Sequence, residues 1–548
     1  DGRLDLGLIP AGIIGSLQVR KGAGAIEYGA NAVAGTVDLQ SRSSGLAAQA
    51  QAGPYGMANL SAAAAMPVAG LTLTLGAAHQ AQSALSVAQA AVLPFSQPAG
   101  GRRLNSDLAA TSWFAALAGS AGPLDWRASL LHIDATRGIP PESDRDPAIT
   151  PPRYWRTPDW QLSQAQIALE VPIGGATARA VALRQWFGQT ITSFRDARYT
   201  LLSGRELNDD DTLGGRLTLR HTLGPATLRW SLSGQISDHR QSDTALPAGT
   251  MTGPLRYRQS LASGGLEADV PLGSAALTLG LGLDASTNPF TGNKPAQPAR
   301  QAATFSAAMA VPLNDAVQLT LSGGRRNRFA SARELFGEAL GRFLSNPALT
   351  PERVWLSDAE LVWRPGGAVI TLNPFWQRVD GSIGQRVVTV NGAALRQRFN
   401  QGAATSIGID LALQLPLSAG LTLEITGNAQ HASSGGQPLL QRPFHEAMAA
   451  IDWAPSRAFD LRAEVRRIGP ARDLGRDLAP RPAPAGQLAR LPPATEINLR
   501  SRVLLTRIGK TRLSATAALD NLLNAAVFPQ LGLPLPGRTL RIGVLLAD

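Results

Sequence analysis

The stretch that decides the fold is RLTLRHTLGPATLRWSLSGQIS, residues 216–237. On either side of the central GPA, apolar side chains occupy alternate positions, and arginine, threonine, serine or glutamine stands between them. Alternation with a period of two residues indicates β-strands, and the short link indicates an antiparallel hairpin with one apolar and one polar face. In a soluble sandwich the apolar face would form the core, whereas in a membrane barrel it would face lipid and the polar face would line the lumen.

The lengths of the connections favour the membrane barrel. Very short turns are expected near residues 68–70, 119–123, 171–175, 224–226, 271–274, 312–316, 364–367, 416–420, 455–458 and 507–510. They alternate with long polar connections centred near 81–108, 136–160, 188–212, 240–258, 288–301, 326–351, 381–400, 432–444, 469–495 and 521–537. Tight turns on one side and long loops on the other are typical of outer-membrane barrels. With a first hairpin around 54–56 and a last strand over 538–546, the pattern predicts an all-β transmembrane antiparallel barrel of about 22 strands.

Composition restricts the function classes. The chain has no cysteine, and its six histidines are scattered, so a disulfide framework and a soluble metalloenzyme are disfavoured. Residues 43–101 contain no Asp, Glu, Lys or Arg, but Pro67, Gly70 and the alternation in LTLTLGAAHQAQ (71–82) favour a strand over a membrane-spanning helix. The formal net charge of +11 comes almost wholly from arginine, which suits anionic lipid headgroups or anionic ligands. A nucleic-acid binder is disfavoured, because the arginines are spread over loops and lumen positions.

The N-terminal part of the chain differs in composition from the alternating segments that follow it. Residues 21–39, KGAGAIEYGANAVAGTVDL, are rich in glycine and small residues, which suits a backbone that turns sharply and packs closely against a wall. The residues after Asp1 do not form a charged segment followed by an apolar stretch. We therefore expect no signal peptide and a chain whose front has been removed.

Several stretches together carry a family resemblance. They are LIPAGIIGSLQVRKGAGAIEYGANAVAGTVDLQSR (8–42), NPALTPERVW (346–355), QGAATSIGIDLAL (401–413), PLLQRPFHEAMAAIDW (438–453) and DNLLNAAVFPQLGLPLPGRTLRIGVLL (520–546). In this order they resemble TonB-dependent outer-membrane receptors. The resemblance implies that residues 1–42 are the C-terminal half of a plug domain, with motif residues Gly22, Tyr28, Gly29 and Gly35, and that residues 43–548 form the barrel, with a partial plug inside its lumen.

By the same resemblance, the chain is expected to import a scarce nutrient such as a ferric siderophore or cobalamin. The implied location is the outer membrane of a Gram-negative bacterium, as a monomer among lipids and lipopolysaccharide, inserted by the barrel-assembly machinery. The energy would come from the TonB–ExbB–ExbD complex, although the TonB-binding segment is absent from this chain. The alternative is a passive pore, or a transport-incompetent remnant with an incomplete plug.

Candidate ligand contacts come from two outer connections. Arginine offers planar donors for carboxylates, and aromatic rings cover the apolar face of a chelate. The connection 137–160 therefore supplies Arg137, Arg145, Arg153, Tyr154, Trp155, Arg156 and Trp160. A second cluster, Arg325, Arg326, Arg328, Arg333 and Arg342, supplies Arg326 and Arg328. The competing interpretation is that these arginines bind lipopolysaccharide phosphates or simply solvate the loops. With no nucleophile elbow and no acid–base pair, we expect no enzyme, no catalytic or metal-binding residue and no covalently bound cofactor.

Overall fold

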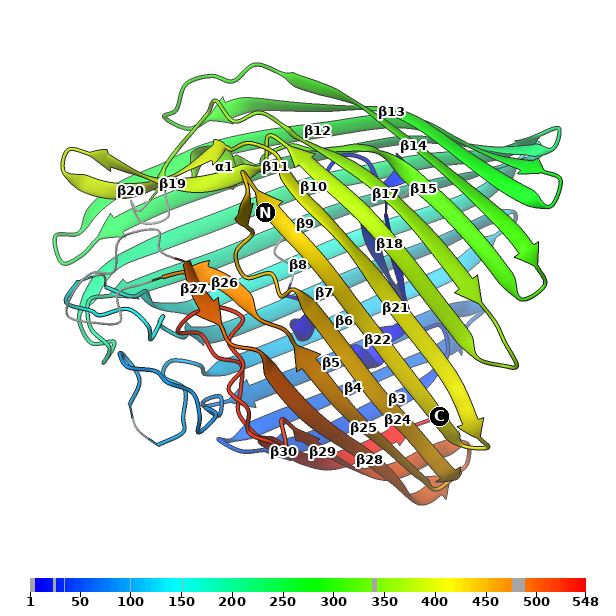
Figure 1. Cartoon of the computed structure of the whole chain (residues 1–548). Coiled ribbons are helices and arrows are strands. Elements are labelled where there is room, and N and C mark those ends of the chain that lie inside the picture. The colour runs from blue at the N-terminus through cyan, green and yellow to red at the C-terminus, as the bar shows by residue number, and fades with distance from the viewer. Residues whose placement is uncertain are drawn as a thin grey trace.

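The computed structural model describes residues 5–22, 26–33, 35–98, 100–149, 151–337, 343–475 and 488–548. Within these ranges, 22 antiparallel strands pair edge to edge and close into one barrel, which confirms the predicted fold class and strand number. The strands are tilted, and the segment that precedes them lies inside the wall (Figure 1). No helix of the described part is long and apolar enough to cross a membrane.

The wall strands are, in chain order, β3 (Gly45–Gly53), β4 (Met57–Val68), β5 (Leu71–Gln82), β6 (Leu108–Ala121), β7 (Leu124–Ile139), β8 (Tyr154–Ile173), β9 (Ala176–Phe194), β10 (Leu202–Leu223), β11 (Ala226–Ala245), β12 (Thr250–Leu272), β13 (Ala275–Thr291), β14 (Arg300–Asn314), β15 (Val317–Arg328), β17 (Glu352–Trp363), β18 (Val369–Asp380), β21 (Ala404–Ser418), β22 (Leu421–Ser434), β24 (His445–Ser456), β25 (Phe459–Ile468), β28 (Ala494–Ile508), β29 (Thr511–Asp520) and β30 (Thr539–Ala547). The two-residue β23 (Gln437–Pro438) pairs with the end of β22. The barrel closes where β3 pairs with β30.

The hairpin that predicted the fold has the expected register. On β10 and β11, Leu217 pairs with Leu232 and Leu219 with Trp230, whereas Arg220 pairs with Arg229 on the other face. Leu217, Trp230 and Leu232 are exposed, Leu232 to 61%. Large exposed apolar side chains recur on strands around the wall, so the apolar face points away from the lumen, as lipid contact requires.

The two rims of the barrel differ, as predicted, but two long connections are shorter than expected. The connection between β9 and β10 is only residues 195–201, and that between β11 and β12 is only 246–249. The predicted loops 188–212 and 240–258 are thus mostly strand. The strands here continue beyond the apolar band, where water contacts both faces and the alternation that marks a half-buried strand disappears.

Smaller elements lie inside the barrel or on its outer rim. Three 3₁₀-helices, η1 (Leu6–Leu8), η2 (Ala11–Ile13) and η3 (Ile26–Tyr28), and the antiparallel pair β1 (Ile14–Lys21) and β2 (Gly35–Ser41) precede the wall. The outer connections carry α1 (Ala332–Phe336), the sheet of β16 (Phe343–Leu344), β19 (Ile383–Val390) and β20 (Ala393–Asn400), and the pair β26 (Ala471–Leu474) and β27 (Leu488–Leu491). Ser331 and Glu334 form a capping box that starts α1.

Candidate functional site

The β1–β2 hairpin crosses the lumen between opposite walls. At its start, Ile13 packs so closely on Gly76 of β5 that a Cβ at Gly76 would lie 2.1 Å from the Ile13 side chain. At its tip, Gly22 has a φ of +83°, and a Cβ there would lie 2.9 Å from the Asp358 carboxylate on β17. Glycine supplies both the close approach and the left-handed backbone at these positions. The hairpin is therefore supported at both ends.

The turn that links the two strands rests in a socket of glycines. The Ile26 side chain is 4% exposed. Cβ atoms added at Gly265 of β12, or at Gly280 and Gly282 of β13, would lie 2.2, 2.6 and 3.0 Å from it. Because the wall has no side chains at these three positions, a β-branched residue of the lumen segment can sit directly on the strand backbones.

Polar contacts hold the same turn. The Ala30 N–H donates to Ser263 Oγ at 2.8 Å, and the Asn31 side chain accepts from the Phe329 N–H at 2.8 Å. Arg326 donates to the Gly29 carbonyl at 3.4 Å. The Arg216 guanidinium lies 4.7 Å from the centre of the Tyr28 ring. Residues 28–31 are thus attached to the wall and to the base of the outer connection that carries α1.

The plug-motif residues fall in this turn and in the hairpin. Gly29 has a φ of +72°, and a Cβ there would meet Ser233 Oγ at 2.5 Å. Gly35 opens β2, with a φ of +143°. Residues 23–25, in the middle of the predicted glycine-rich stretch, lie outside the described residues.

Two polar cavities flank the hairpin. One of about 800 Å³ includes Val19 of β1 in its lining, and another of about 720 Å³ includes Gln18 and Arg20, which point to the opposite side of the same strand. The first is acidic, with Glu267, Asp358, Glu360, Asp410, Glu446 and Arg466 in its lining. The second is richer in arginine, with Arg20, Arg179, Arg216, Arg220 and Arg229 in its lining. The hairpin therefore separates regions of opposite charge inside one lumen.

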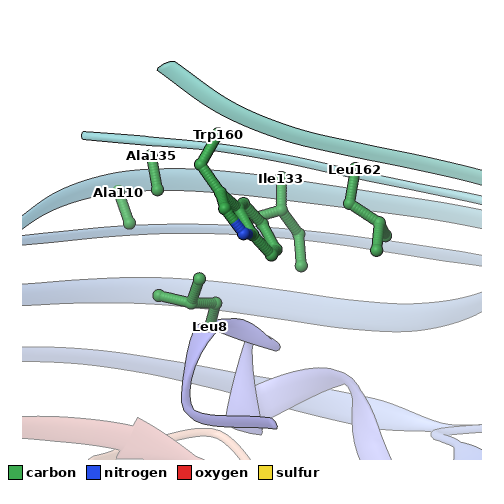
Figure 2. Close-up of a cluster of buried hydrophobic side chains, with 6 residues drawn as sticks. All are labelled: Leu8, Ala110, Ile133, Ala135, Trp160 and Leu162. Atoms are coloured by element: carbon green, nitrogen blue, oxygen red, sulfur yellow. The ribbon is translucent and has the colours of Figure 1, made fainter. Parts of the chain in front are cut away.

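Figure 2 shows how the first residues of the segment meet the wall: Leu8 points into a cluster formed by Ala110, Ile133, Ala135, Trp160 and Leu162. Trp160, a predicted ligand contact, is 2% exposed and belongs to this cluster. Arg137 lies beside it and pairs with Asp5 of the lumen segment at 3.2 Å. Both residues therefore contact the lumen segment.

The remaining candidates of the 137–160 connection form an ion-pair network with neighbouring loops. Glu142 is buried, accepts from Arg153 Nε at 2.6 Å and lies 3.8 Å from Arg145. Burial raises the pKa of Glu142, but Arg153, Arg145 and backbone donors outweigh it and lower the pKa to about 2. Arg156 pairs with Asp107 at 2.5 Å. The buried Tyr154 hydroxyl lies 2.6 Å from Ser96 Oγ.

Arg153 and Trp155 lie side by side in this network, and both are partly accessible. The Arg153 side chain is 37% exposed and lies 5.7 Å from the centre of the Trp155 ring. Arg137 also lies over a tryptophan ring, 6.0 Å from the centre of Trp160, but Trp160 is buried. Arg153 and Trp155 therefore offer the more accessible aromatic face.

The second predicted cluster is divided between the lumen and the rim. Arg326 is 2% exposed and binds the lumen turn. Arg328 pairs with Glu352 at 2.5 Å and with Glu334 of α1 at 2.9 Å. Arg342 lies outside the described residues.

Sequence reasoning missed Arg103, which joins three outer connections. It is 4% exposed and donates to Ser143 Oγ at 2.8 Å, to the Pro141 carbonyl at 2.5 Å and to the Gly532 carbonyl at 3.0 Å. Burial lowers its pKa to about 10. No local pattern marks this residue, because its partners lie up to 429 positions away in the chain. The glycine socket of Ile26 was missed for the same reason.

No group of three or more His, Cys, Asp or Glu side chains in the described ranges is arranged to hold a metal ion.

Comparison with known proteins identifies the family. Residues 95–522 match the family model described as TonB dependent receptor-like, beta-barrel. No curated protein matches in sequence. Among solved structures, the chain is similar to the copper transporter OprC, at 16% identity and a TM-score of 0.78 over 97% of this chain and 85% of that one. It is similar to the FrpB iron transporter from Neisseria meningitidis (F3-3 variant), at 14% identity and 0.77 over 98% and 88%. It also resembles the siderophore receptor PirA from Acinetobacter baumannii, at 12% identity and 0.77 over 100% and 87%. Because the family model covers most of the chain, the protein belongs to the TonB-dependent receptors.

Proposed function

We propose that this protein is an outer-membrane receptor that imports a metal chelate, such as a ferric siderophore, with energy from the TonB–ExbB–ExbD complex. The observation that carries the proposal is the hairpin inside the closed barrel, attached at Gly76 and Asp358 on opposite walls and at Ser263 between them. An internal segment held by many small contacts can block a lumen and still be displaced when an energy source acts on it. The solved structures with this fold include copper and iron transporters and a siderophore receptor, which supports a metal-containing cargo.

In this proposal, residues 1–42 are the C-terminal half of the plug domain and residues 43–548 are the barrel. The support is topological: among the residues that the structure describes, β1 and β2 pair only with each other, whereas β3 begins the closed sheet. The inverted surface, with apolar side chains outside and polar side chains within, fits insertion in the bacterial outer membrane as a single barrel.

For the ligand contact we propose Arg153 and Trp155. The exposed part of the Arg153 guanidinium offers planar donors to an anionic chelate, and the Trp155 ring offers an apolar face. Arg137, Arg145, Arg156, Arg326 and Arg328 are proposed to hold the lumen segment and the outer loops in place, because each has an acidic or carbonyl partner within the chain and is less exposed than Arg153.

Uptake of labelled ferric siderophores, a copper chelate and cobalamin tests the function, in a strain that carries the complete gene as its only receptor. We expect energy-dependent uptake of one metal chelate, reduced at least tenfold by Arg153→Ala with Trp155→Ala. Asp315→Asn, an exposed change at the short-turn rim, serves as the control and leaves uptake unchanged. If none of these compounds is taken up, metal-chelate import is wrong.

A passive pore is the second candidate, and the two cavities beside the hairpin favour it, because about 800 and 720 Å³ of the lumen is empty of described residues. Steady conductance of the purified chain in a planar bilayer decides between the two. A receptor conducts little until its plug moves, whereas a pore conducts continuously.

A further inference from the structure

A cluster of arginines lies on the lipid-facing surface of β15, β17 and β18. Phe305, Arg325, Trp355 and Arg378 are register partners across four neighbouring strands, so their side chains share one face of the sheet. Arg353 pairs with Asp380 in the next row.

This face is the outer one. Ser322 and Asp358 line the internal cavity, and side chains alternate between the two faces of a strand. Arg325 and Trp355 stand three positions from Ser322 and Asp358 respectively, so they point away from the lumen. The exposed Leu321 and Trp376 share their face.

The cluster also lies at the boundary of the apolar band on the long-connection side. Trp355 and Trp363, the outer- and inner-rim tryptophans of β17, are eight positions apart, about 27 Å along a strand. Strand tilt reduces this to about 20 Å of height, close to the apolar band of membrane barrels. The arginines are therefore level with the headgroups of the outer leaflet.

The protein neutralises these arginines only in part. Arg378 pairs with Asp380 at 2.8 Å, and the other Asp380 oxygen accepts from Trp355 Nε1 at 3.2 Å. Within the described ranges, the Arg325 guanidinium contacts only the Trp355 ring, 5.8 Å from its centre, and its buried Nε has no hydrogen-bond partner. Arg353 is exposed. Three guanidinium groups thus face one carboxylate that is already occupied.

An apolar groove continues from the cluster toward the middle of the barrel. It has a volume of about 750 Å³, and its lining includes Leu277, Met309, Leu321, Trp376 and Ile407. A cationic cluster above an apolar groove matches an amphiphile with an anionic headgroup and acyl chains.

We propose that this surface binds a phosphorylated glycolipid of the outer leaflet. Guanidinium groups bind phosphate oxygens through paired N–H donors. Arg325 and Arg378 are separated by two strand spacings, about 10 Å, with the Trp355 ring between them. This arrangement suits a headgroup in which a sugar lies on the ring and phosphates reach the arginines on either side. The acyl chains occupy the groove.

The inference rests on the proposed outer-membrane location, but its test does not depend on transport. The complete chain is purified in detergent, and lipid retention is measured by native mass spectrometry with a diphosphorylated disaccharide lipid (lipid A). The same lipid without phosphates and phosphatidylglycerol serve as comparisons. We expect binding of the diphosphorylated lipid that weakens with salt and falls at least tenfold in Arg325→Gln with Arg378→Gln.

Arg364→Gln with Arg507→Gln removes the same charge at the opposite rim and is the matched control, with binding unchanged. Arg325→Lys keeps the charge and should retain most of the binding. The site is wrong if the double variant binds as much diphosphorylated lipid as the unchanged protein. It is also wrong if the unchanged protein binds the lipid without phosphates equally well. Equal binding of phosphatidylglycerol overturns the choice of a glycolipid and leaves a general anionic-lipid surface. Loss of chelate uptake with lipid binding intact would count against the proposed function alone.

Discussion

At the scale of single residues, the contact between Ile26 and its glycine socket should contribute measurably to the stability of the lumen segment. A methyl group at Gly265 would lie 2.2 Å from the Ile26 side chain, so Gly265→Ala should displace η3 and destabilise the lumen segment by about 1–3 kcal/mol. Ile26→Ala alone should leave a cavity and cost about 2–4 kcal/mol. Combined, the two changes should cost less than their sum, because the smaller side chain makes room for the added methyl group.

The measurement is the rate at which a protease cuts residues 26–33 in the folded barrel. Gly402→Ala, where nothing lies within 4 Å and the backbone is not left-handed, provides a control for the loss of a glycine. Strict additivity in the double variant would mean that the socket does not hold the turn.

Glu142 is the residue whose charge should make the outer loops sensitive to acid. Its pKa of about 2 in the folded protein lies below the ordinary 4.5, so its contribution is fully present above pH 4.5. That contribution falls as the pH drops through the folded pKa. We expect protease sensitivity of the 140–153 connection to rise between pH 4.5 and 2, and Glu142→Gln to show the raised sensitivity already at neutral pH.

Pepsin, which stays active in acid, is the protease for the low end of this pH range. Asp315→Asn changes the charge by the same amount as Glu142→Gln and serves as the control. An unchanged cleavage profile in Glu142→Gln would contradict the buried ion-pair assignment.

At the scale of elements, Arg103 joins three outer connections that are far apart in sequence. Its removal leaves the Pro141 and Gly532 carbonyls without their charged donor, and breaking a buried charged contact of this kind costs about 3 kcal/mol. Arg103→Gln should therefore loosen the connections 83–107, 140–153 and 521–538 together, which simultaneous cleavage at all three sites would reveal. Arg102→Gln is the neighbouring control, since Arg102 is exposed. Cleavage confined to one connection would disprove the joint role.

The elements also explain what the sequence could predict. The turn and the two faces of the β10–β11 hairpin were predicted correctly, because lipid on one face and polar lumen on the other impose a period of two. The upper parts of β9 to β12 were predicted as loops, because water on both faces removes that period. The arginines of 137–160 were recognised as a cluster, but their partners Asp5, Asp107 and Glu142 belong partly to other segments. Only the closed barrel brings these residues together.

At the scale of the whole molecule, the barrel and its lumen segment form a system in which transport requires relative movement. The contact between Ala30 and Ser263 offers a place to prevent it, because the Ala30 nitrogen and Ser263 Oγ are 2.8 Å apart. The chain has no cysteine, so a pair introduced at these positions has no competing thiol. In the complete receptor, Ala30→Cys with Ser263→Cys should form a disulfide that holds the turn on the wall.

If the proposed import requires the turn to leave its socket, uptake by the oxidised double variant should fall at least tenfold and return on reduction. Thr212→Cys with Ser237→Cys joins two register partners within the wall, and this cross-link should leave uptake unchanged. Each single cysteine variant should also transport normally. Full uptake by the cross-linked Ala30–Ser263 variant would show that the cargo passes while residues 28–31 stay in place, and the route would then have to run through one of the two flanking cavities. The acidic and arginine-rich linings make these routes distinguishable, because an anionic chelate would be repelled by the first and attracted by the second.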